Sequence, residues 1–98
     1  MSAGRVLVVD DSADITAILT LTLRRAGLQV ATAGDGVDAL AKLEAELPDV
    51  VLLDVMMPRM DGLETLRRIR GNPRTVHLPI IMLTAKAQLA DKMAGFER

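Results

Sequence analysis

The sequence predicts an α/β fold built as a doubly wound parallel sheet, and three observations support this prediction. Continuous apolar runs within residues 5–9, 50–53 and 79–83 have the length and composition of strands in a buried parallel sheet. Apolar residues recur at helical spacing between these runs. The resulting alternation of strands and helices is typical of parallel sheets whose strands are joined by right-handed crossovers.

Composition narrows the possible functions of the chain. Its 98 residues suffice for one small domain, which we expect to span residues 1–98. With 12 basic and 13 acidic residues, the net charge of -1 offers no basic surface to nucleic acid or to a membrane. The absence of cysteine excludes disulfides and thiolate metal sites, and no apolar run approaches the ~18 residues of a membrane span. We therefore expect a cytoplasmic domain that binds neither nucleic acid nor membrane.

The first strand, residues 5–9, ends on two acids, Asp10 and Asp11. From Ser12 onward the apolar spacing changes to that of one face of an amphipathic helix. Ser12 or Asp11 can cap this helix, and Gly27 marks its end. The residues expected on its apolar face are Ile15, Ile18, Leu19, Thr22, Leu23 and Ala26.

Residues 28–33 follow as a short strand, and their alternating pattern is typical of a half-exposed edge strand. A second helix comes next, supported by the oppositely charged pair Asp38 and Lys42, four residues apart. Pro48 stops this helix. Its apolar positions are Val37, Leu40, Leu43 and Leu47.

The strand at residues 50–53 is wholly apolar, and we predict that it is buried on both faces of the sheet. It ends on a single acid, Asp54, at the strand edge where ligands bind in open α/β sheets. Pro58 and Gly62 predict a tight loop that holds Asp54 at this edge and then begins a helix. The apolar positions of that third helix are Leu63, Leu66 and Ile69.

The last predicted strand, residues 79–83, is again apolar and ends on a hydroxyl residue, Thr84. A fourth helix is predicted from about Lys86. Its apolar positions are Leu89, Met93 and Phe96.

Polar residues therefore follow three predicted strands at one edge of one sheet, namely Asp10 with Asp11, Asp54 and Thr84. If the first and third strands are neighbours, three carboxylates meet within a few ångströms. Two like charges ~5 Å apart at an effective dielectric constant of ~20 cost on the order of 3 kcal/mol, so raised pKa values or a bound cation must offset the repulsion. Oxygen ligands without histidine or cysteine select a hard divalent ion. Mg²⁺ is the best match, with Asp11 and Asp54 as its first candidate ligands.

Each of these residues also has a purely structural interpretation. The Asp10–Asp11 pair can cap the following helix, Asp54 can serve a turn, and Thr84 can satisfy loop backbone groups. Capping does not require all three strands to end in this way. Their joint placement therefore favours a binding or catalytic site.

Three segments of the chain carry a resemblance to a known family. Residues 6–11, 52–62 and 79–85 are similar in spacing, order and flanking apolar runs to the receiver domain of bacterial two-component response regulators. The similarity extends over essentially the whole chain. It implies a flavodoxin-like sheet of strand order 2-1-3-4-5.

The same resemblance implies a role for each site residue. Asp54 would accept a phosphoryl group from a phosphohistidine on a histidine kinase or phosphotransfer protein. Asp11, Asp54 and the backbone carbonyl of Met56 would hold Mg²⁺, and Asp10 would order the water shell of the metal. Thr84 would act as a switch hydroxyl that hydrogen-bonds the new phosphoryl oxygen. Such a domain is not an enzyme beyond self-catalysed transfer to its own aspartate.

The chain departs from the family at its C-terminal end. Receivers continue into a fifth strand, which ends on a Lys-Pro pair, and a fifth helix, so the order implied here is 2-1-3-4 with both elements missing after Arg98. The family's phosphoryl-binding lysine has no counterpart, because Lys86 occupies a different position. We expect a fragment of a longer receiver, or a chain that self-associates through the exposed apolar edge at Ile80–Leu83. An apolar flank around Leu19 and Leu23 should be exposed as well.

Two other functions stay open. A non-phosphorylated pseudo-receiver or receiver fragment would act as a protein-interaction or oligomerisation module. The missing lysine favours this alternative, whereas the acidic residues and Thr84 argue against it. A phosphatase of the haloacid-dehalogenase class also uses a strand-end aspartyl nucleophile. That class requires a second acid two residues after the nucleophile, where this chain has Met56.

Overall fold

The computed structural model describes residues 4–57 and 59–83, which form four strands and three helices in strict alternation. The elements are β1 (Arg5–Val9), α1 (Ala13–Arg25), β2 (Gln29–Ala33), α2 (Gly36–Ala45), β3 (Val50–Asp54), α3 (Gly62–Arg70) and β4 (Ile80–Leu83). Each of the predicted elements within this range is confirmed. Thr84 and the helix predicted from about Lys86 lie outside the described residues.

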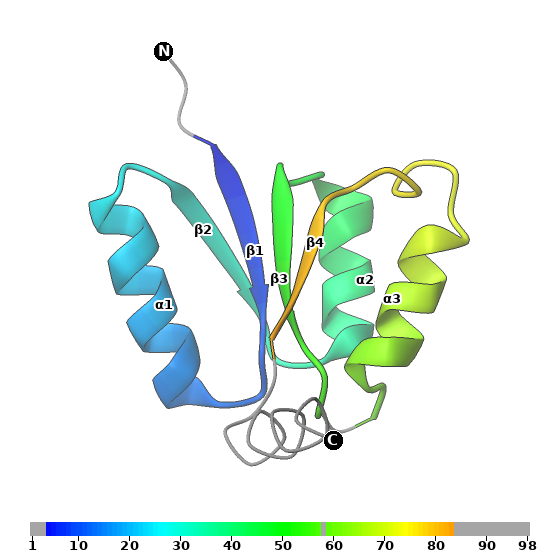
Figure 1. The fold of residues 1–98 in the computed structure, drawn as a ribbon, viewed down its shortest axis with the longest axis horizontal. Coiled ribbons are helices and arrows are strands. Elements are labelled where there is room, and N and C mark those ends of the chain that lie inside the picture. Colours follow the sequence, from blue (N-terminus) through cyan, green and yellow to red (C-terminus); the bar gives the residue numbers. More distant parts are fainter. Residues whose placement is uncertain (1–3, 58, 84–98) are drawn as a thin grey trace, which may run out of the picture.

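All strand pairs of the sheet are parallel, and the strand order is β2-β1-β3-β4 (Figure 1). Figure 1 shows α1 on one face of this sheet and α2 with α3 on the other, as expected for a doubly wound fold. The adjacency of β1 and β3, on which the predicted acidic site depends, is confirmed. The carboxyl ends of β1, β3 and β4 lie at the same edge of the sheet.

The main hydrophobic core lies between the sheet and the layer formed by α2 and α3. It is built from aliphatic side chains, because the sequence has a single aromatic residue. Its buried members are Leu7, Val9, Ala33, Ala39, Leu43, Val51, Leu53, Ile69 and Leu78.

Side-chain caps define where the helices begin. The Ser12 hydroxyl accepts a hydrogen bond from the backbone N–H of Ile15 at 3.3 Å, so Ser12 caps α1 as predicted. Asp35 and Asp61 cap α2 and α3 in the same way. At the other end of α1, Gly27 adopts a left-handed φ of 91°, which ends the helix and suits glycine.

The helix α2 ends earlier than its apolar pattern predicts. The last helical residue is Ala45, and Glu46 already has an extended backbone. Leu47 therefore lies beyond the helix and is exposed. The cause is Pro48, which disfavours the helical conformation of the residue before it.

The other face of the sheet is less covered than predicted. Because α1 packs over β1 and β2, Val8 is buried, but Leu52 is half-buried and Ile81 is 55% exposed. The prediction that β3 is buried on both faces is therefore wrong for Val50 and Leu52, which are both half-buried. Along this face, burial decreases stepwise from β1 to β4.

The exposed apolar flank of α1 also differs from the predicted one. Leu19 and Leu23 are half-buried against the sheet, whereas Ile15 and Ile18 are exposed, Ile18 by 61%. The helix is thus rotated relative to the predicted apolar face. No residue of α1 is fully buried, because no other described helix lies on this face of the sheet.

Candidate functional site

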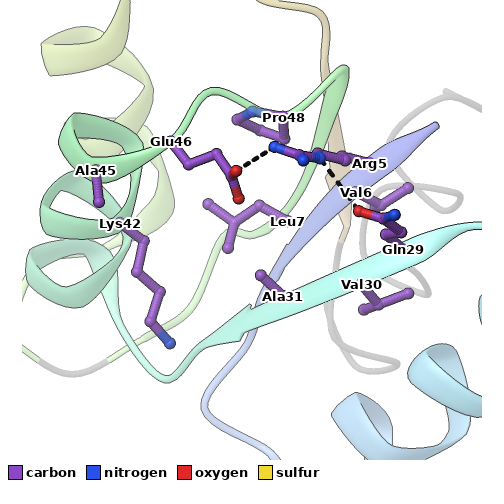
Figure 2. Close-up of a pocket in the computed structure, with 10 residues that line it drawn as sticks. All are labelled: Arg5, Val6, Leu7, Gln29, Val30, Ala31, Lys42, Ala45, Glu46 and Pro48. Carbon is purple, nitrogen blue, oxygen red and sulfur yellow. Dashed lines mark hydrogen bonds and ion pairs between the residues drawn. The ribbon is translucent and has the colours of Figure 1, made fainter. Parts of the chain in front are cut away.

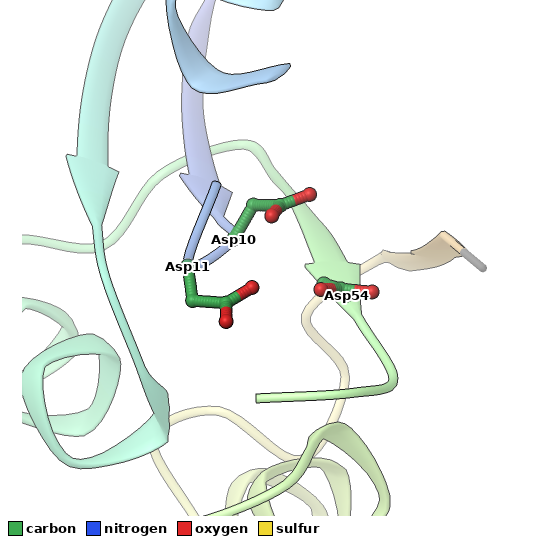
Figure 3. A group of neighbouring side chains, drawn as sticks. All are labelled: Asp10, Asp11 and Asp54. Carbon is green, nitrogen blue, oxygen red and sulfur yellow. The ribbon is translucent and has the colours of Figure 1, made fainter. Parts of the chain in front are cut away.

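The carboxyl ends of β1 and β3 bring three acids together. The strands pair in register, with Val9 opposite Leu53, so that the residues that follow lie side by side. One carboxylate oxygen from each of Asp10, Asp11 and Asp54 lies within 4.8 Å of the other two (Figure 3). The sequence prediction that these residues form one cluster is confirmed by this geometry.

Asp10 and Asp11 occupy different environments although they are adjacent. Asp10 is 9% exposed, and its Oδ1 accepts a hydrogen bond from the backbone N–H of Ser12 at 2.8 Å. Its own N–H donates to the Ala33 carbonyl at 3.0 Å, which ties it to the end of β2. Asp11 is exposed to solvent. Asp10 is therefore fixed by the fold, whereas Asp11 is accessible to a ligand.

Hydrogen bonds of the backbone that follows Asp54 hold this residue at the end of β3. It is 6% exposed, and its Oδ1 accepts a hydrogen bond of 3.4 Å from the N–H of Met56. The next residue, Val55, donates to the Leu83 carbonyl of β4 at 3.0 Å and accepts from Gly62 N–H at 2.8 Å. The start of α3 is therefore folded back onto the strand end that carries Asp54.

Gly62 is required by this close approach. A Cβ atom at Gly62 would overlap the Asp54 carbonyl oxygen and would lie 2.7 Å from the Cα of Val55. The sequence pattern predicts Gly62 only as a loop residue at a helix start and does not indicate its packing against the backbone of Asp54 and Val55. Glycine directly at the start of a helix after a strand-end acid was the signal that could have indicated it.

The remaining predicted site residues are placed less completely. Met56 lies in the loop after β3, two positions after Asp54 in the sequence, and its side chain is exposed. Thr84 lies outside the described residues, and the last described residue before it is Leu83, at the end of β4.

Burial raises the pKa of the Asp54 carboxyl above its usual value, and the charges of Asp10 and then Asp11 raise it further. The hydrogen bond from Met56 N–H opposes these effects. The ion pairs within the described part of the chain all involve other acids, so no described cation neutralises the cluster. Three oxygen ligands with uncompensated negative charge fit a divalent cation, and the cluster could hold a metal ion.

The raised pKa of Asp54 predicts a measurable pH dependence of stability. A folded-state pKa above the unfolded one means that the folded chain binds more protons, so its stability falls as pH rises through that window. Without divalent ions, we expect Asp54→Asn to be more stable than wild type at pH 7 by about 1–2 kcal/mol, since it removes a buried charge and its repulsion by the neighbouring acids. The difference should vanish well below the unfolded pKa of 3.8, at about pH 2.5, where the Asp54 carboxyl is protonated in both states.

Urea unfolding followed by circular dichroism, at pH 7 and at about pH 2.5, measures this difference. Mg²⁺ should stabilise the wild type and not Asp54→Asn, because a cation that binds the folded state shifts the equilibrium toward it. Equal stability of the two proteins at pH 7 in a chelating buffer would contradict the prediction.

A cavity of about 250 Å³ lies at the opposite edge of the sheet, where β1 and β2 begin (Figure 2). Its wall includes apolar atoms of Leu7, Ala31 and Pro48. Its charged groups are paired within the protein: Arg5 forms an ion pair with Glu46, and Lys42 forms one with Asp38 at 3.5 Å. The Nε of Arg5 also donates to Gln29 at 3.1 Å. The cavity is separate from the acidic cluster, because none of the three clustered acids lines it.

Comparison with known proteins identifies related chains. A family model described as "Response regulator receiver domain" matches residues 6–98. The alkaline phosphatase synthesis transcriptional regulatory protein PhoP of Bacillus subtilis is 45% identical over 93 residues, which are 95% of this chain and 38% of PhoP. The response regulator PleD of Caulobacter vibrioides is 43% identical over 95 residues, or 97% of this chain and 21% of PleD. The chain thus spans well under half the length of these relatives.

Solved structures have the same fold. The N-terminal domain of a response regulator receiver protein from Methanoculleus marisnigri superposes with a TM-score of 0.84 at 44% identity, covering 95% of this chain and 78% of that one. A putative response regulator from Chloroflexus aurantiacus gives a TM-score of 0.86 at 41% identity, covering 98% and 79%. In the described part of the chain, no helix has the length and apolar character of a membrane span.

Proposed function

Because the chain belongs to the response regulator receiver family, whose standard role is that of a phosphoacceptor in two-component signalling, we propose that Asp54 is its phosphoacceptor. The observation that carries this proposal is the placement of Asp54 at the end of β3, within 4.8 Å of two further carboxylates. Receiver domains are signal transducers rather than enzymes. Asp54 would therefore be modified once in each signalling cycle.

The chain's own residues supply the nucleophile and its surroundings. A carboxylate oxygen of Asp54 attacks phosphorus, and the bond from phosphorus to the imidazole nitrogen of the donor phosphohistidine breaks. Asp11, Asp54 and the Met56 carbonyl would hold Mg²⁺, and Asp10, fixed by Ser12 N–H, would orient the water shell. Bound there, Mg²⁺ would neutralise charge on the acids and on the phosphoryl group.

The raised pKa of Asp54 fits this assignment. Uncompensated negative charge at the cluster favours a cation, and a cation bound there would lower the pKa of the Asp54 carboxyl and so favour the carboxylate form that attacks phosphorus. We further propose that Thr84, which follows the last residue of β4, is the switch hydroxyl that binds the new phosphoryl oxygen. This role comes from its position in the family motif.

We propose a histidine kinase or phosphotransfer protein as the donor, acting on this domain in the cytoplasm. Response regulators take part in such exchanges with these partners. The net charge of -1 supports no contact with nucleic acid by residues 1–98, although relatives such as PhoP are named as transcriptional regulators. Those relatives are much longer than this chain, and the transcriptional regulation in their names is a property of those proteins.

Intact-mass spectrometry after incubation with Mg²⁺ and a small acyl-phosphate donor tests the phosphoacceptor role. We expect the mass of one phosphoryl group to be added, and to be lost on treatment with hydroxylamine, which cleaves acyl phosphates. Chelation of Mg²⁺ before the donor is added should prevent the gain. A folded protein that gains no mass with Mg²⁺ present would overturn the proposal.

A second proposal, self-association through β4, is favoured by a specific observation. Among the described residues, β4 pairs with β3 on one side and has no strand on the other. Its outer edge is apolar along its whole length, and Ile81 is 55% exposed. Such an edge is a template for pairing with another strand, and the same edge of a second copy is a suitable partner.

Self-association of this kind predicts a dimer that a single charge disrupts. Light scattering coupled to size exclusion should give a mass above that of the monomer for the wild type, and the mass of a monomer for Ile81→Lys, because lysine blocks edge pairing. Leu63→Lys, at an equally exposed apolar position on α3, serves as the matched control and should leave the mass unchanged. A strictly monomeric wild type would contradict the proposal.

A further inference from the structure

The loop between β3 and α3, residues 55–61, is tied to the start of α2 by an ion pair. The Nε of Arg59 donates a hydrogen bond to Oδ2 of Asp35 at 2.8 Å, and its Nη2 donates to the same oxygen. Arg59 belongs to the loop that leaves Asp54, whereas Asp35 caps α2 and lies 24 positions earlier in the sequence. The contact therefore joins two loops at the edge of the sheet that carries the acidic cluster.

Asp35 is arranged to receive this contact. It is 8% exposed, and its Oδ1 accepts the backbone N–H of Asp38 at 2.8 Å as the cap of α2. This leaves Oδ2 for the guanidinium of Arg59. The hydrogen bond from Asp38, and then that from Arg59, hold the pKa of the Asp35 carboxyl below its usual value, so it is ionised at neutral pH.

The backbone of Arg59 is in an unfavourable conformation. Its φ is +64°, and among the described residues no other non-glycine residue has a positive φ. The left-handed region is sterically costly for a residue with a Cβ, and such a conformation persists when the surrounding structure enforces it. The ion pair between the Arg59 side chain and Asp35 is one contact that helps to enforce this backbone conformation.

The neighbouring contact shows how closely the loop approaches α2. A Cβ at Gly36 would lie 2.9 Å from the Met60 carbonyl oxygen, which is closer than side chains tolerate. Gly36 thus allows the loop to lie directly against the start of α2. The ion pair and this backbone contact together fix two consecutive loop residues, Arg59 and Met60.

We propose that Arg59 is a positioning residue, which with Asp35 forms a clamp that holds the β3–α3 loop in the conformation needed at Asp54. Arg59 contacts none of the acids in the cluster and acts through the loop backbone. The fixing of the loop follows from the geometry alone. Its consequence for Mg²⁺, through the backbone carbonyl of Met56, rests on the proposed function.

Two variants remove the clamp while preserving the local backbone. Arg59→Gly deletes the guanidinium and places glycine where φ is positive, so it relieves strain rather than adding it. Asp35→Asn keeps a side-chain oxygen to cap α2, since asparagine caps as well as aspartate, but removes the charge. Arg67→Ala, which deletes an exposed arginine paired with Glu64 on α3, is the matched control.

Hydrogen–deuterium exchange of the metal-free protein measures the clamp directly. We expect the amides of residues 55–57 and 59–61 to exchange at least about fivefold faster in Arg59→Gly and Asp35→Asn, with the rest of the chain unchanged, because loop opening is a local event. High salt should accelerate amide exchange in this loop of the wild type, because it screens the ion pair, and should not do so in Arg59→Gly. Unchanged exchange of the loop in both variants would overturn the clamp.

Mg²⁺ affinity, measured by calorimetry, tests the consequence for the site. Both variants should bind Mg²⁺ about tenfold more weakly than the wild type, which is the lower end of the range found when groups that orient metal ligands are removed. If the wild type accepts a phosphoryl group but loop exchange is unchanged in the variants, the clamp fails and the phosphoacceptor role stands. If exchange increases but the wild type accepts no phosphoryl group, the clamp stands and the phosphoacceptor role fails.

Discussion

Asp54→Asn is expected to reduce phosphoryl uptake from an acyl-phosphate donor to below detection while leaving the fold intact. The amide has nearly the same shape as the carboxylate but lacks a nucleophilic oxygen, and the metal would lose one anionic ligand. The folded state should gain stability from the change, because it removes the burial of a charge and the repulsion from Asp10, which together raise the pKa of Asp54. Intact-mass spectrometry with and without Mg²⁺ measures the loss, and circular dichroism confirms the fold.

Asp38→Asn provides the matched control for this variant. Asp38 is an acid of the same kind on α2, is paired with Lys42 at 3.5 Å, and is not one of the three clustered acids. Its replacement should leave phosphoryl uptake at the wild-type level. A wild-type mass gain in Asp54→Asn would place the phosphoryl group on another residue and would contradict the assignment.

The sequence predicts the fold and the acidic cluster for the same physical reason. Continuous apolar runs indicate buried parallel strands, and parallel strands present their carboxyl ends at one edge. Acids that follow two such strands therefore meet in space although Asp10 and Asp54 lie far apart along the chain. The prediction needed one long-range premise, that the first and third strands are neighbours, and the strand order confirms it. The separation of the three carboxylates, within 4.8 Å, follows from that adjacency.

The features that sequence patterns did not predict depend on how the elements are rotated and how closely they approach. Helical spacing marked an apolar face on α1, but the neighbours of α1 decide that Leu19 packs inward and Ile18 does not. Nothing local in the sequence pairs Arg59 with Asp35, because they lie in different loops. Their contact exists because the fold brings both loops to one edge of the sheet.

Gly62→Ala is expected to destabilise the protein by about 2–3 kcal/mol, the usual cost of forcing an extra group into a well-packed position. The added methyl group would overlap the Asp54 carbonyl oxygen and lie 2.7 Å from the Cα of Val55. Both neighbours are backbone atoms at the end of β3, where Val55 N–H is bonded to β4, so they cannot move aside as a flexible side chain would. Alanine favours helix over glycine by at most about 1 kcal/mol, which does not offset the overlap.

Gly34→Ala is the matched control, because a Cβ at Gly34 meets no atom within 4 Å and should change stability by no more than about 1 kcal/mol. Urea unfolding of both variants, followed by circular dichroism, gives the comparison, and equal midpoints would contradict the prediction. The hydrogen bond from Gly62 N–H to the Val55 carbonyl, at 2.8 Å, links α3 to the residue after Asp54. A helix displaced by the methyl group must therefore shift the strand end as well. Phosphoryl uptake should accordingly fall in Gly62→Ala even under conditions where the protein stays folded, because the packing that stabilises α3 also positions the acid.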